Sequence, residues 1–248
     1  MLDSYLKPMI FAHRGASKYA PENTVEAFQL AANHGTEAIE LDVKLTVDNQ
    51  AVVIHDKTVD RTTDGIGQVN QLTLAEIKKL NAANQFENYQ GVKVPTLDEV
   101  FESVGKLLFI NVELTNYSSS HDNLIPIVAN IVKRHGVQQS ILFSSFIPAN
   151  LRKMKTLLPE VPVGLLAQSG FRGALSRSSI FLGLSPQIIH PNLEDVNEKM
   201  MATEHKRGRR VHVWTVNEEA DIKRLLGLGV DGIFTDDPLN TLKILGRK

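Results

Sequence analysis

The chain has 248 residues and a formal net charge of −1, and 42% of its residues are hydrophobic. A chain of this length can bury a large core within one domain. Because it contains no cysteine, disulfide scaffolds, cysteine nucleophiles and thiolate metal sites are excluded. The near-neutral charge argues against a nucleic-acid partner, for which an excess of Lys and Arg is typical.

We also expect no targeting signal. No apolar run approaches the roughly 18 residues that a membrane span requires, so we expect no stable membrane insertion. The first residues, Met1-Leu2-Asp3-Ser4, carry an acid where a signal peptide carries positive charge. We therefore expect a cytoplasmic protein, and the sequence carries no signal for an oligomeric state.

Short apolar runs alternate with amphipathic segments along the chain. Strands are expected at Met9–Ala12, Ala38–Asp42, Leu107–Glu113, Ser140–Phe143, Val163–Ala167, Gln187–His190, Val211–Thr215 and Gly232–Thr235. Helices are expected between them, including Thr24–Ala32, Leu124–His135, Ala149–Leu158, Asp195–Lys206 and Glu218–Leu226. Eight strands alternating with helices favour an α/β fold of the TIM type, a closed parallel (β/α)8 barrel, with an eight-stranded open sheet as the alternative.

One segment interrupts this alternation after the second strand. The dozen residues between Asp42 and His55 are too few for a parallel crossover, so we expect an antiparallel return strand. Asp48-Asn49 at the centre suits a two-residue hairpin turn. With that turn, Lys44 pairs with Val53 and Asp42 lies opposite His55.

The residues after this hairpin form a small insertion. We expect a single domain over 1–248, with 57–106 as an inserted subdomain that is not a further barrel unit. Within it, Thr73 and Glu76 have the spacing of a capping box at the start of a short helix.

Two expected strands carry acids on their polar face. In the first of them, three apolar residues share one face and two acids share the other: Ile39, Leu41 and Val43 against Glu40 and Asp42. Because helices cover the outside of a barrel, the acids point inward near the C-terminal end of the strand, where barrel active sites lie. The strand that ends near Leu114 repeats the pattern, with Asn111 and Glu113 inward.

Three carboxylates that converge on one barrel mouth repel one another and are costly to desolvate. A divalent cation would offset this cost, so Glu40, Asp42 and Glu113 are candidate metal ligands. Ligation by oxygen alone favours Mg²⁺ or Ca²⁺ over Zn²⁺. The alternative is that a buried Lys or Arg neutralises these acids, and Lys44 shares their face of the strand.

Two histidines follow strands that end at the same mouth. His13 follows the first strand, and His55 ends the return strand of the hairpin. Such a pair can act as general acid and general base near neutral pH. The forked cation of Arg14 suits a phosphate group.

Two further residues at strand ends are candidate substrate contacts. His190 ends a strand and precedes Pro191, which places it at the barrel mouth. Trp214 also ends a strand and is predicted to form a wall of the pocket. His212 lies deeper on the same face and is expected to be a hydrogen-bonded core histidine.

The motifs of the chain, taken in order, resemble those of the glycerophosphodiester phosphodiesterase family. They are His13-Arg14-Gly15, Pro21-Glu22-Asn23-Thr24, Glu40-Leu41-Asp42-Val43, Val53-Ile54-His55-Asp56, Arg61-Thr62-Thr63-Asp64-Gly65, Val94-Pro95-Thr96-Leu97, Asn111-Val112-Glu113, Val213-Trp214-Thr215-Val216-Asn217, and the run from Gly229 to Pro238. The resemblance covers nearly the whole chain in the order found in the family.

This resemblance implies a TIM-type barrel with an insertion after the His-Asp pair. It also implies metal-dependent hydrolysis of a small-molecule glycerophosphodiester to glycerol 3-phosphate and an alcohol. The same acids would then bind the metal, His13 and His55 would be the acid/base pair, and Arg14 would contact the phosphate. One position departs from the family pattern, because Thr115 stands where many members carry Lys.

Two other functions stay open at this point. A phospholipase-type phosphodiesterase on the same barrel would need an apolar rim, and the loop 169–173 offers a single Phe. A non-catalytic phosphodiester-binding module would be favoured by the loss of a histidine or an acid. All five of these residues are present, which favours an enzyme.

Overall fold

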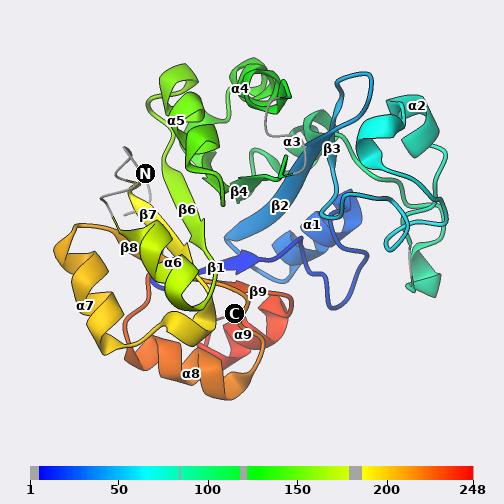
Figure 1. Cartoon of the computed structure of the whole chain (residues 1–248). Coiled ribbons are helices and arrows are strands. Elements are labelled where there is room, and N and C mark those ends of the chain that lie inside the picture. The colour runs from blue at the N-terminus through cyan, green and yellow to red at the C-terminus, as the bar shows by residue number, and fades with distance from the viewer. Residues whose placement is uncertain (1–5, 84, 118–121, 179–185, 248) are drawn as a thin grey trace.

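The structure is a computed structural model that describes residues 6–83, 85–117, 122–178 and 186–247, so the N-terminal residues 1–4 discussed above lie outside it. Eight parallel strands close into a barrel, which confirms the predicted fold (Figure 1). These strands are β1 (Met9–Ala12), β2 (Ala38–Leu45), β4 (Phe109–Leu114), β5 (Ile141–Ser145), β6 (Val163–Ala167), β7 (Ile188–Pro191), β8 (Arg210–Val213) and β9 (Gly232–Thr235). Each corresponds to one of the eight expected strands.

The barrel closes because β1 pairs in parallel with both β2 and β9, which leaves no open edge between them. Around the barrel the strands follow the order β1, β9, β8, β7, β6, β5, β4, β2. The open-sheet alternative is therefore wrong. In a closed parallel barrel, the carboxyl ends of all eight strands meet at one mouth.

Helices surround the strands, as Figure 1 shows. They are α1 (Val25–Asn33), α2 (Leu74–Ile77), α3 (Leu97–Val104), α4 (Leu124–His135), α5 (Pro148–Leu157), α6 (Gly170–Arg177), α7 (Glu198–Lys206), α8 (Glu219–Gly227) and α9 (Pro238–Ile244). Short 3₁₀ turns lie at Val69–Gln71, Glu87–Tyr89, Gln138–Ser140 and Leu193–Asp195. Among the described residues, none of the helices is long and apolar enough to cross a bilayer.

Successive side chains of β2 and β4 point alternately to the outer layer of the barrel and to its interior. The outward residues of β2, such as Ile39 and Leu41, pack with residues of α1, α3 and α4 in the layer between strands and helices. A separate cluster fills the barrel interior with inward residues, including Phe11, Phe109 and Phe234. The expected outward placement of the apolar face of these strands is confirmed, and it leaves the polar face pointing into the barrel.

The hairpin after β2 exists, but its predicted register is wrong by one residue. β3 (Ala51–Val53) pairs antiparallel with β2, with Lys44 opposite Val52 and not opposite Val53. The loop contains three residues and not two, because Asn49 takes a left-handed conformation (φ 59°) and the backbone N–H of Thr46 pairs with Gln50. A three-residue loop with a left-handed residue is the next common hairpin type.

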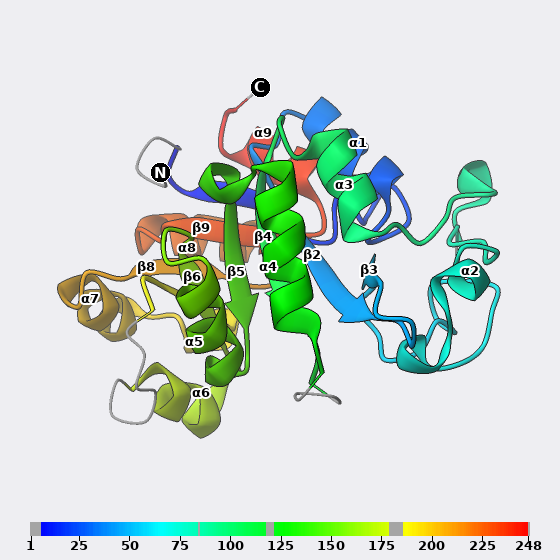
Figure 2. The same ribbon diagram turned by 90° about the horizontal axis from the view of Figure 1, so that it is seen from above.

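The insertion, which contains α2, projects to one side of the barrel (Figure 2). It has a small apolar cluster of its own, formed by Val52, Ile54, Val59, Val69, Ile77, Ala82, Val92 and Val94. The capping box of Thr73 and Glu76 is present at the start of α2. Residues of α3 pack in the barrel layer. The boundaries 57–106 and the single domain over 1–248 stay predictions.

Candidate active site

The pairing of β2 with β4 brings three carboxylates to one place at the barrel mouth. Glu40 lies opposite Asn111 and Asp42 lies opposite Glu113, so the acids occupy two successive inward levels of adjacent strands. One oxygen from each of the three acids lies within 4.8 Å of the others. The structure thus brings together the three predicted metal ligands.

This cluster is electrostatically strained. Burial raises the pKa of Glu40 well above its usual value, and the neighbouring charges of Asp42 and Glu113 raise it further. Burial and the charge of Asp42 raise the pKa of Glu113 to about 8, against an opposing hydrogen bond from Tyr117. Without a cation, the cluster therefore favours a protonated Glu113 carboxyl near neutral pH.

The residues present fit a divalent cation. Glu40 Oε1 is buried and has no hydrogen-bond partner among the described residues. Arg14 Nε lies 3.5 Å from Asp42 Oδ2, whereas Lys44 Nζ donates to the carbonyl oxygen (2.9 Å) and Oγ1 (2.8 Å) of Thr115. The protein cations therefore leave an oxygen of the cluster without a partner, and hard oxygen donors are the ligands that Mg²⁺ and Ca²⁺ prefer.

The loop between β1 and α1 orients the acids. The backbone N–H of Arg14 donates to Glu40 Oε2 at 3.0 Å, and Asn23 Nδ2 donates to Asp42 Oδ2 at 2.9 Å. Both Arg14 (φ 56°) and Asn23 (φ 57°) are left-handed, a conformation that non-glycine residues rarely adopt and that clusters at functional sites. Sequence reasoning gave Asn23 no role.

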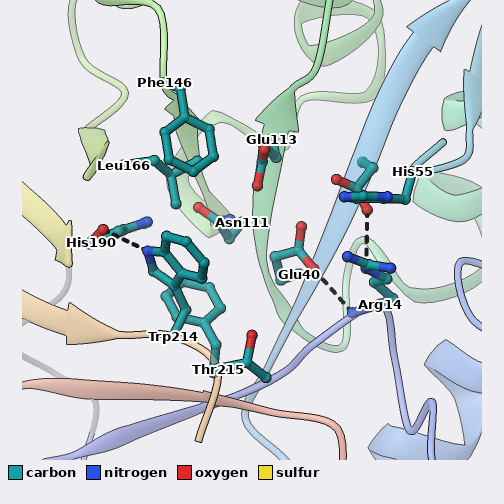
Figure 3. A pocket seen from close by; sticks show the side chains of 12 residues that line it. Arg14, Glu40, His55, Asn111, Glu113, Phe146, Leu166, His190, Trp214 and Thr215 are labelled. Carbon is teal, nitrogen blue, oxygen red and sulfur yellow. Dashed lines mark hydrogen bonds and ion pairs between the residues drawn. The ribbon is translucent and has the colours of Figure 1, made fainter. Parts of the chain in front are cut away.

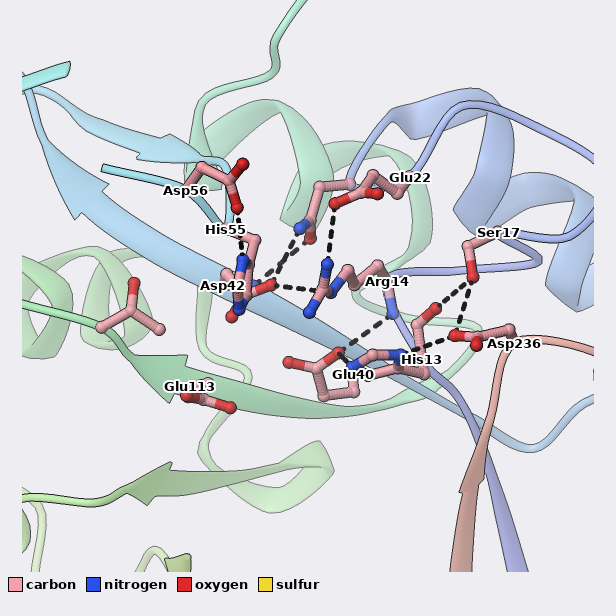
Figure 4. A network of polar contacts seen from close by, with 12 residues as sticks. His13, Arg14, Ser17, Glu22, Glu40, Asp42, His55, Asp56, Glu113 and Asp236 are labelled. Carbon is pink, nitrogen blue, oxygen red and sulfur yellow. Dashed lines mark hydrogen bonds and ion pairs between the residues drawn. The ribbon is translucent and has the colours of Figure 1, made fainter. Parts of the chain in front are cut away.

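His13 pairs through its Nδ1 atom with Asp236, which lies in the loop between β9 and α9. Its Nδ1 lies 2.6 Å from Asp236 Oδ1, and its Nε2 lies 4.0 Å from Glu40 Oε2 (Figure 4). Although burial opposes it, the hydrogen bond with His13 lowers the pKa of Asp236 to about 2. Since Asp236 is ionised, it accepts a hydrogen bond from Nδ1–H and leaves Nε2 as the nitrogen directed at the acids.

His55 has a matching arrangement on the opposite side of the cluster. Its Nδ1 lies 2.7 Å from Asp56 Oδ1, and Arg61 Nε binds Asp56 Oδ2 at 2.7 Å. Arg61 also binds Glu22, which in turn accepts a hydrogen bond from Arg14 Nη1 at 2.9 Å. Hydrogen bonds from Arg61 and from His55 lower the pKa of Asp56 against the effect of burial. A chain of ion pairs therefore joins His55 to Arg14.

Two cavities meet at this site. The smaller one, of about 110 Å³, has a polar side formed by Arg14, Glu40, Asp42, His55, Asn111 and Glu113 and an apolar side that includes Phe146, Leu166, Trp214 and Phe234 (Figure 3). The larger one, of about 580 Å³, is lined by His13 and Asp236 among others. Arg14 lines both cavities.

The structure places both predicted substrate contacts of the C-terminal half on the smaller cavity. His190 is fully buried, and Trp214 Nε1 donates to the carbonyl oxygen of His190 at 2.7 Å. The expectation that His212 is hydrogen-bonded is wrong. Neither of its ring nitrogens has a partner among the described residues, because the ring stacks between His190 and Phe11 in the barrel interior. Burial lowers the pKa of His212 to about 3, so its ring stays neutral.

Several residues of the site were not assigned a role from the sequence. Asp236, Glu22 and Arg61 lie inside the family-like motifs, but the pairing of Asp236 with His13 and of Arg61 with Glu22 joins loops that are distant in sequence. Tyr117, whose hydroxyl donates to Glu113 Oε1 at 2.6 Å, lies outside those motifs and carries no sequence signal.

A (β/α)8 barrel whose mouth combines an oxygen-donor cluster with two carboxylate-paired imidazoles belongs to the class of barrel proteins equipped for metal-assisted acid/base chemistry. Comparison with known proteins identifies the group within this class. The model of the glycerophosphoryl diester phosphodiesterase family matches residues 13–240. The chain belongs to this family and is a phosphoric diester hydrolase.

Individual relatives agree with this assignment. A glycerophosphodiester phosphodiesterase from Caldanaerobacter subterraneus subsp. tengcongensis is 39% identical, covering 98% of this chain and 99% of the relative. One from Bacillus altitudinis is 35% identical, covering 95% and 97%. Among solved structures, an Oleispira antarctica phosphodiesterase in complex with its product sn-glycerol-3-phosphate is 30% identical, covers 99% of both chains and superposes with a TM-score of 0.89.

Proposed function

We propose that this chain hydrolyses glycerophosphodiesters to glycerol 3-phosphate and an alcohol, with a divalent metal ion and with His13 and His55 as the acid/base pair. The observation that carries the proposal is the position of two carboxylate-paired imidazoles around three carboxylates at one barrel mouth. The relatives named as glycerophosphodiester phosphodiesterases and the product-bound neighbour support the choice of substrate.

Glu40, Asp42 and Glu113 would hold the metal, which we propose is Mg²⁺ or Ca²⁺ because every candidate ligand is a carboxylate oxygen. When bound, such an ion supplies Lewis-acid stabilisation of the negative charge that develops on the phosphate oxygens. Burial by itself lowers the pKa of Arg14, but Asp42, Glu22 and Glu40 outweigh this effect and raise it. Arg14 therefore stays a cation, and it would contact the phosphate from a position that lines both cavities.

The histidines would move the two protons that the reaction requires. Because Asp236 and Asp56 engage the Nδ1 atoms, Nε2 of each ring is available for transfer. One Nε2 takes the proton of the attacking hydroxyl as the new P–O bond forms. The other Nε2 donates a proton to the departing alkoxide oxygen as the old P–O bond breaks. The proton balance is the same for attack by water and for attack by the neighbouring glycerol hydroxyl.

The two cavities suit the two arms of such a substrate. The smaller cavity, with His190 and Trp214 on its wall, would take the glycerol arm. The larger cavity, of about 580 Å³, lies beside His13 and would take the alcohol arm. Arg14 lines both cavities, so the phosphate would lie beside Arg14, with Glu40 and His55 on one side and His13 on the other.

Turnover of several glycerophospho-alcohols by purified protein, followed by detection of released glycerol 3-phosphate, tests this proposal. We expect chelation to abolish turnover and either Mg²⁺ or Ca²⁺ to restore it, and the more effective ion identifies the metal. Full turnover after exhaustive chelation would contradict the metal site. Absence of turnover with every glycerophospho-alcohol and both ions would contradict the substrate class.

A further inference from the structure

His190, on the wall of the smaller cavity, takes no part in the proposed proton transfers. His190 at the end of β7 is fully buried and lines the cavity, yet neither of its ring nitrogens has a hydrogen-bond partner among the described residues. Burial and the adjacent His212 lower the pKa of His190 well below its usual value, so the ring is neutral and carries one N–H. A buried donor without a partner destabilises the protein. A ligand group in the cavity would offset this destabilisation.

The neighbouring strand makes room for this ring. A Cβ atom on Gly164 of β6 would lie 2.5 Å from His190 Nε2 and 2.7 Å from Cε1, closer than atoms can approach. The absence of a side chain at Gly164 therefore allows the imidazole to occupy the barrel interior. The position of the His190 ring therefore depends on both β7, which carries it, and β6, where Gly164 leaves space for it.

A second unpartnered polar atom faces the same cavity. Asn111 Nδ2 donates to Ser144 Oγ at 2.9 Å, while Asn111 Oδ1 is buried and has no partner among the described residues. Figure 3 shows His190 and Asn111 projecting toward the same cavity. An amide oxygen accepts a hydrogen bond, and a neutral imidazole can donate one. Together they match a hydroxyl group, which both accepts and donates.

The rest of this end of the cavity is apolar, because Phe146, Leu166 and Phe234 lie on its walls. The carbon–hydrogen faces of a short polyol suit these walls.

We propose that His190 and Asn111 bind the terminal hydroxyl of the glycerol arm, the one that is not adjacent to the phosphoester carbon. This inference rests on the proposed function and narrows its substrate class. The enzyme acts on fully deacylated glycerophosphodiesters and rejects diesters whose terminal hydroxyl is missing or acylated, because burial of His190 and Asn111 against an apolar group leaves both unpaired.

Three diesters of the same alcohol test this selectivity with the unmodified protein: glycerophosphocholine, its 1,2-propanediol analogue and 1-acyl lysophosphatidylcholine. The propanediol analogue lacks only the terminal hydroxyl and keeps the neighbouring one. We expect kcat/KM to fall about 10- to 100-fold for the analogue and at least as much for the acylated diester. Values within about threefold of one another would overturn the proposal.

His190→Phe, compared with His212→Phe, locates the selectivity. Both histidines are buried and stacked on each other, but of the two only His190 lines the cavity. We expect His190→Phe to lower kcat/KM for glycerophosphocholine about 10- to 100-fold without lowering it for the propanediol analogue, which removes the selectivity. His212→Phe should keep the ratio of the unmodified protein. An unchanged ratio in His190→Phe, or loss of the ratio in both variants, would overturn the proposal.

A binding measurement gives a readout that does not depend on turnover or on the folding of a variant. Calorimetric titration of the unmodified protein should show about 10-fold or greater preference for glycerol 3-phosphate over 1,2-propanediol 1-phosphate. Equal affinity would overturn the role of the hydroxyl. By contrast, absence of turnover with all three diesters would contradict the proposed function itself, so the two failures are distinguishable.

Discussion

His13 and His55 are both held by an aspartate at Nδ1, one from the far end of the chain and one from the next residue. We expect His13→Ala and His55→Ala each to lower kcat about 100- to 10,000-fold, because each removes one proton transfer. The double variant should lose much less than the product of the single losses, since residues that act as a unit are not additive.

His135→Ala is a matched control for these variants. His135 also pairs with an aspartate, with Nε2 at 2.6 Å from Asp98, but it lies on α4 away from the barrel mouth. Its removal should leave kcat unchanged. Near-normal turnover in either active-site variant, or strict multiplicativity in the double variant, would contradict the paired role.

The departure from the family pattern at Thr115 also has a local explanation. Thr115 is buried, and its hydroxyl donates to the carbonyl oxygen of Val43 while accepting from Lys44 Nζ. Lys44, on the neighbouring strand, thus brings an ammonium group to this position. Burial lowers the pKa of Lys44, although Asp42 and Glu113 oppose the effect.

We therefore expect Thr115→Lys to destabilise the protein by about 1–3 kcal/mol, because it overpacks a buried site and brings two ammonium groups together. Adding Lys44→Met should recover part of this loss, and Thr115→Ser, which keeps the hydroxyl, should be nearly neutral. Urea unfolding of the four proteins measures the effect. Full stability of Thr115→Lys alone would show that Lys44 does not occupy this space.

At the scale of elements, the loop between β1 and α1 carries much of the site. It contains His13 and Arg14, and Gly15 follows with φ at +84°. A Cβ atom at Gly15 would lie 2.7 Å from the carbonyl carbon of Ala27 in α1. The glycine therefore allows both the backbone turn and the close approach of the loop to the helix.

Gly15→Ala should cost more stability than Gly91→Ala, which shares a positive φ (+87°) but has nothing within 4 Å of the added Cβ atom. The left-handed backbone costs about 1–2 kcal/mol in both variants, so the difference reports the contact with Ala27. Displacement of His13 and Arg14 should lower kcat/KM about 100-fold in Gly15→Ala alone. Equal melting temperatures and equal turnover would contradict this view of the loop.

For the whole molecule, the acidic cluster links stability to pH. In the metal-free protein the pKa of Glu113 is about 8, against an ordinary value of 4.5. The folded state therefore binds more protons than the unfolded state between these values. Its stability is greatest below this range and falls as pH rises through it. Metal affinity should change in the opposite direction, because the ligands must be deprotonated.

Glu113→Gln should raise the melting temperature of chelator-treated protein near pH 9 and change it little near pH 5, where the carboxyl is already protonated in the folded state. The same substitution should weaken Mg²⁺ and Ca²⁺ binding in calorimetric titrations. Glu102→Gln, at an exposed position of α3, provides the control and should change neither property. Equal metal affinity in Glu113→Gln and the unmodified protein would show that the three acids are structural.

The sequence predicted the fold class correctly, because strand and helix periodicity is local and a barrel repeats one local pattern eight times. It also determined that Glu40, Asp42 and Glu113 meet, since alternation fixes the face of each side chain and parallel strands end at one mouth. The histidine positions followed in the same way from strand ends.

Features that depend on contacts between residues distant in sequence could not be predicted and became visible only in the folded chain. The pairing of His13 with Asp236 requires closure of β1 against β9, and the occupation of the Thr115 site by Lys44 requires the register of β2 with β4. The loop of three residues at Asn49 depended on a single left-handed residue that the composition of the turn leaves open. The unpartnered ring of His190 appears only once the interior is packed, because hydrogen-bond satisfaction is a property of the space around a side chain.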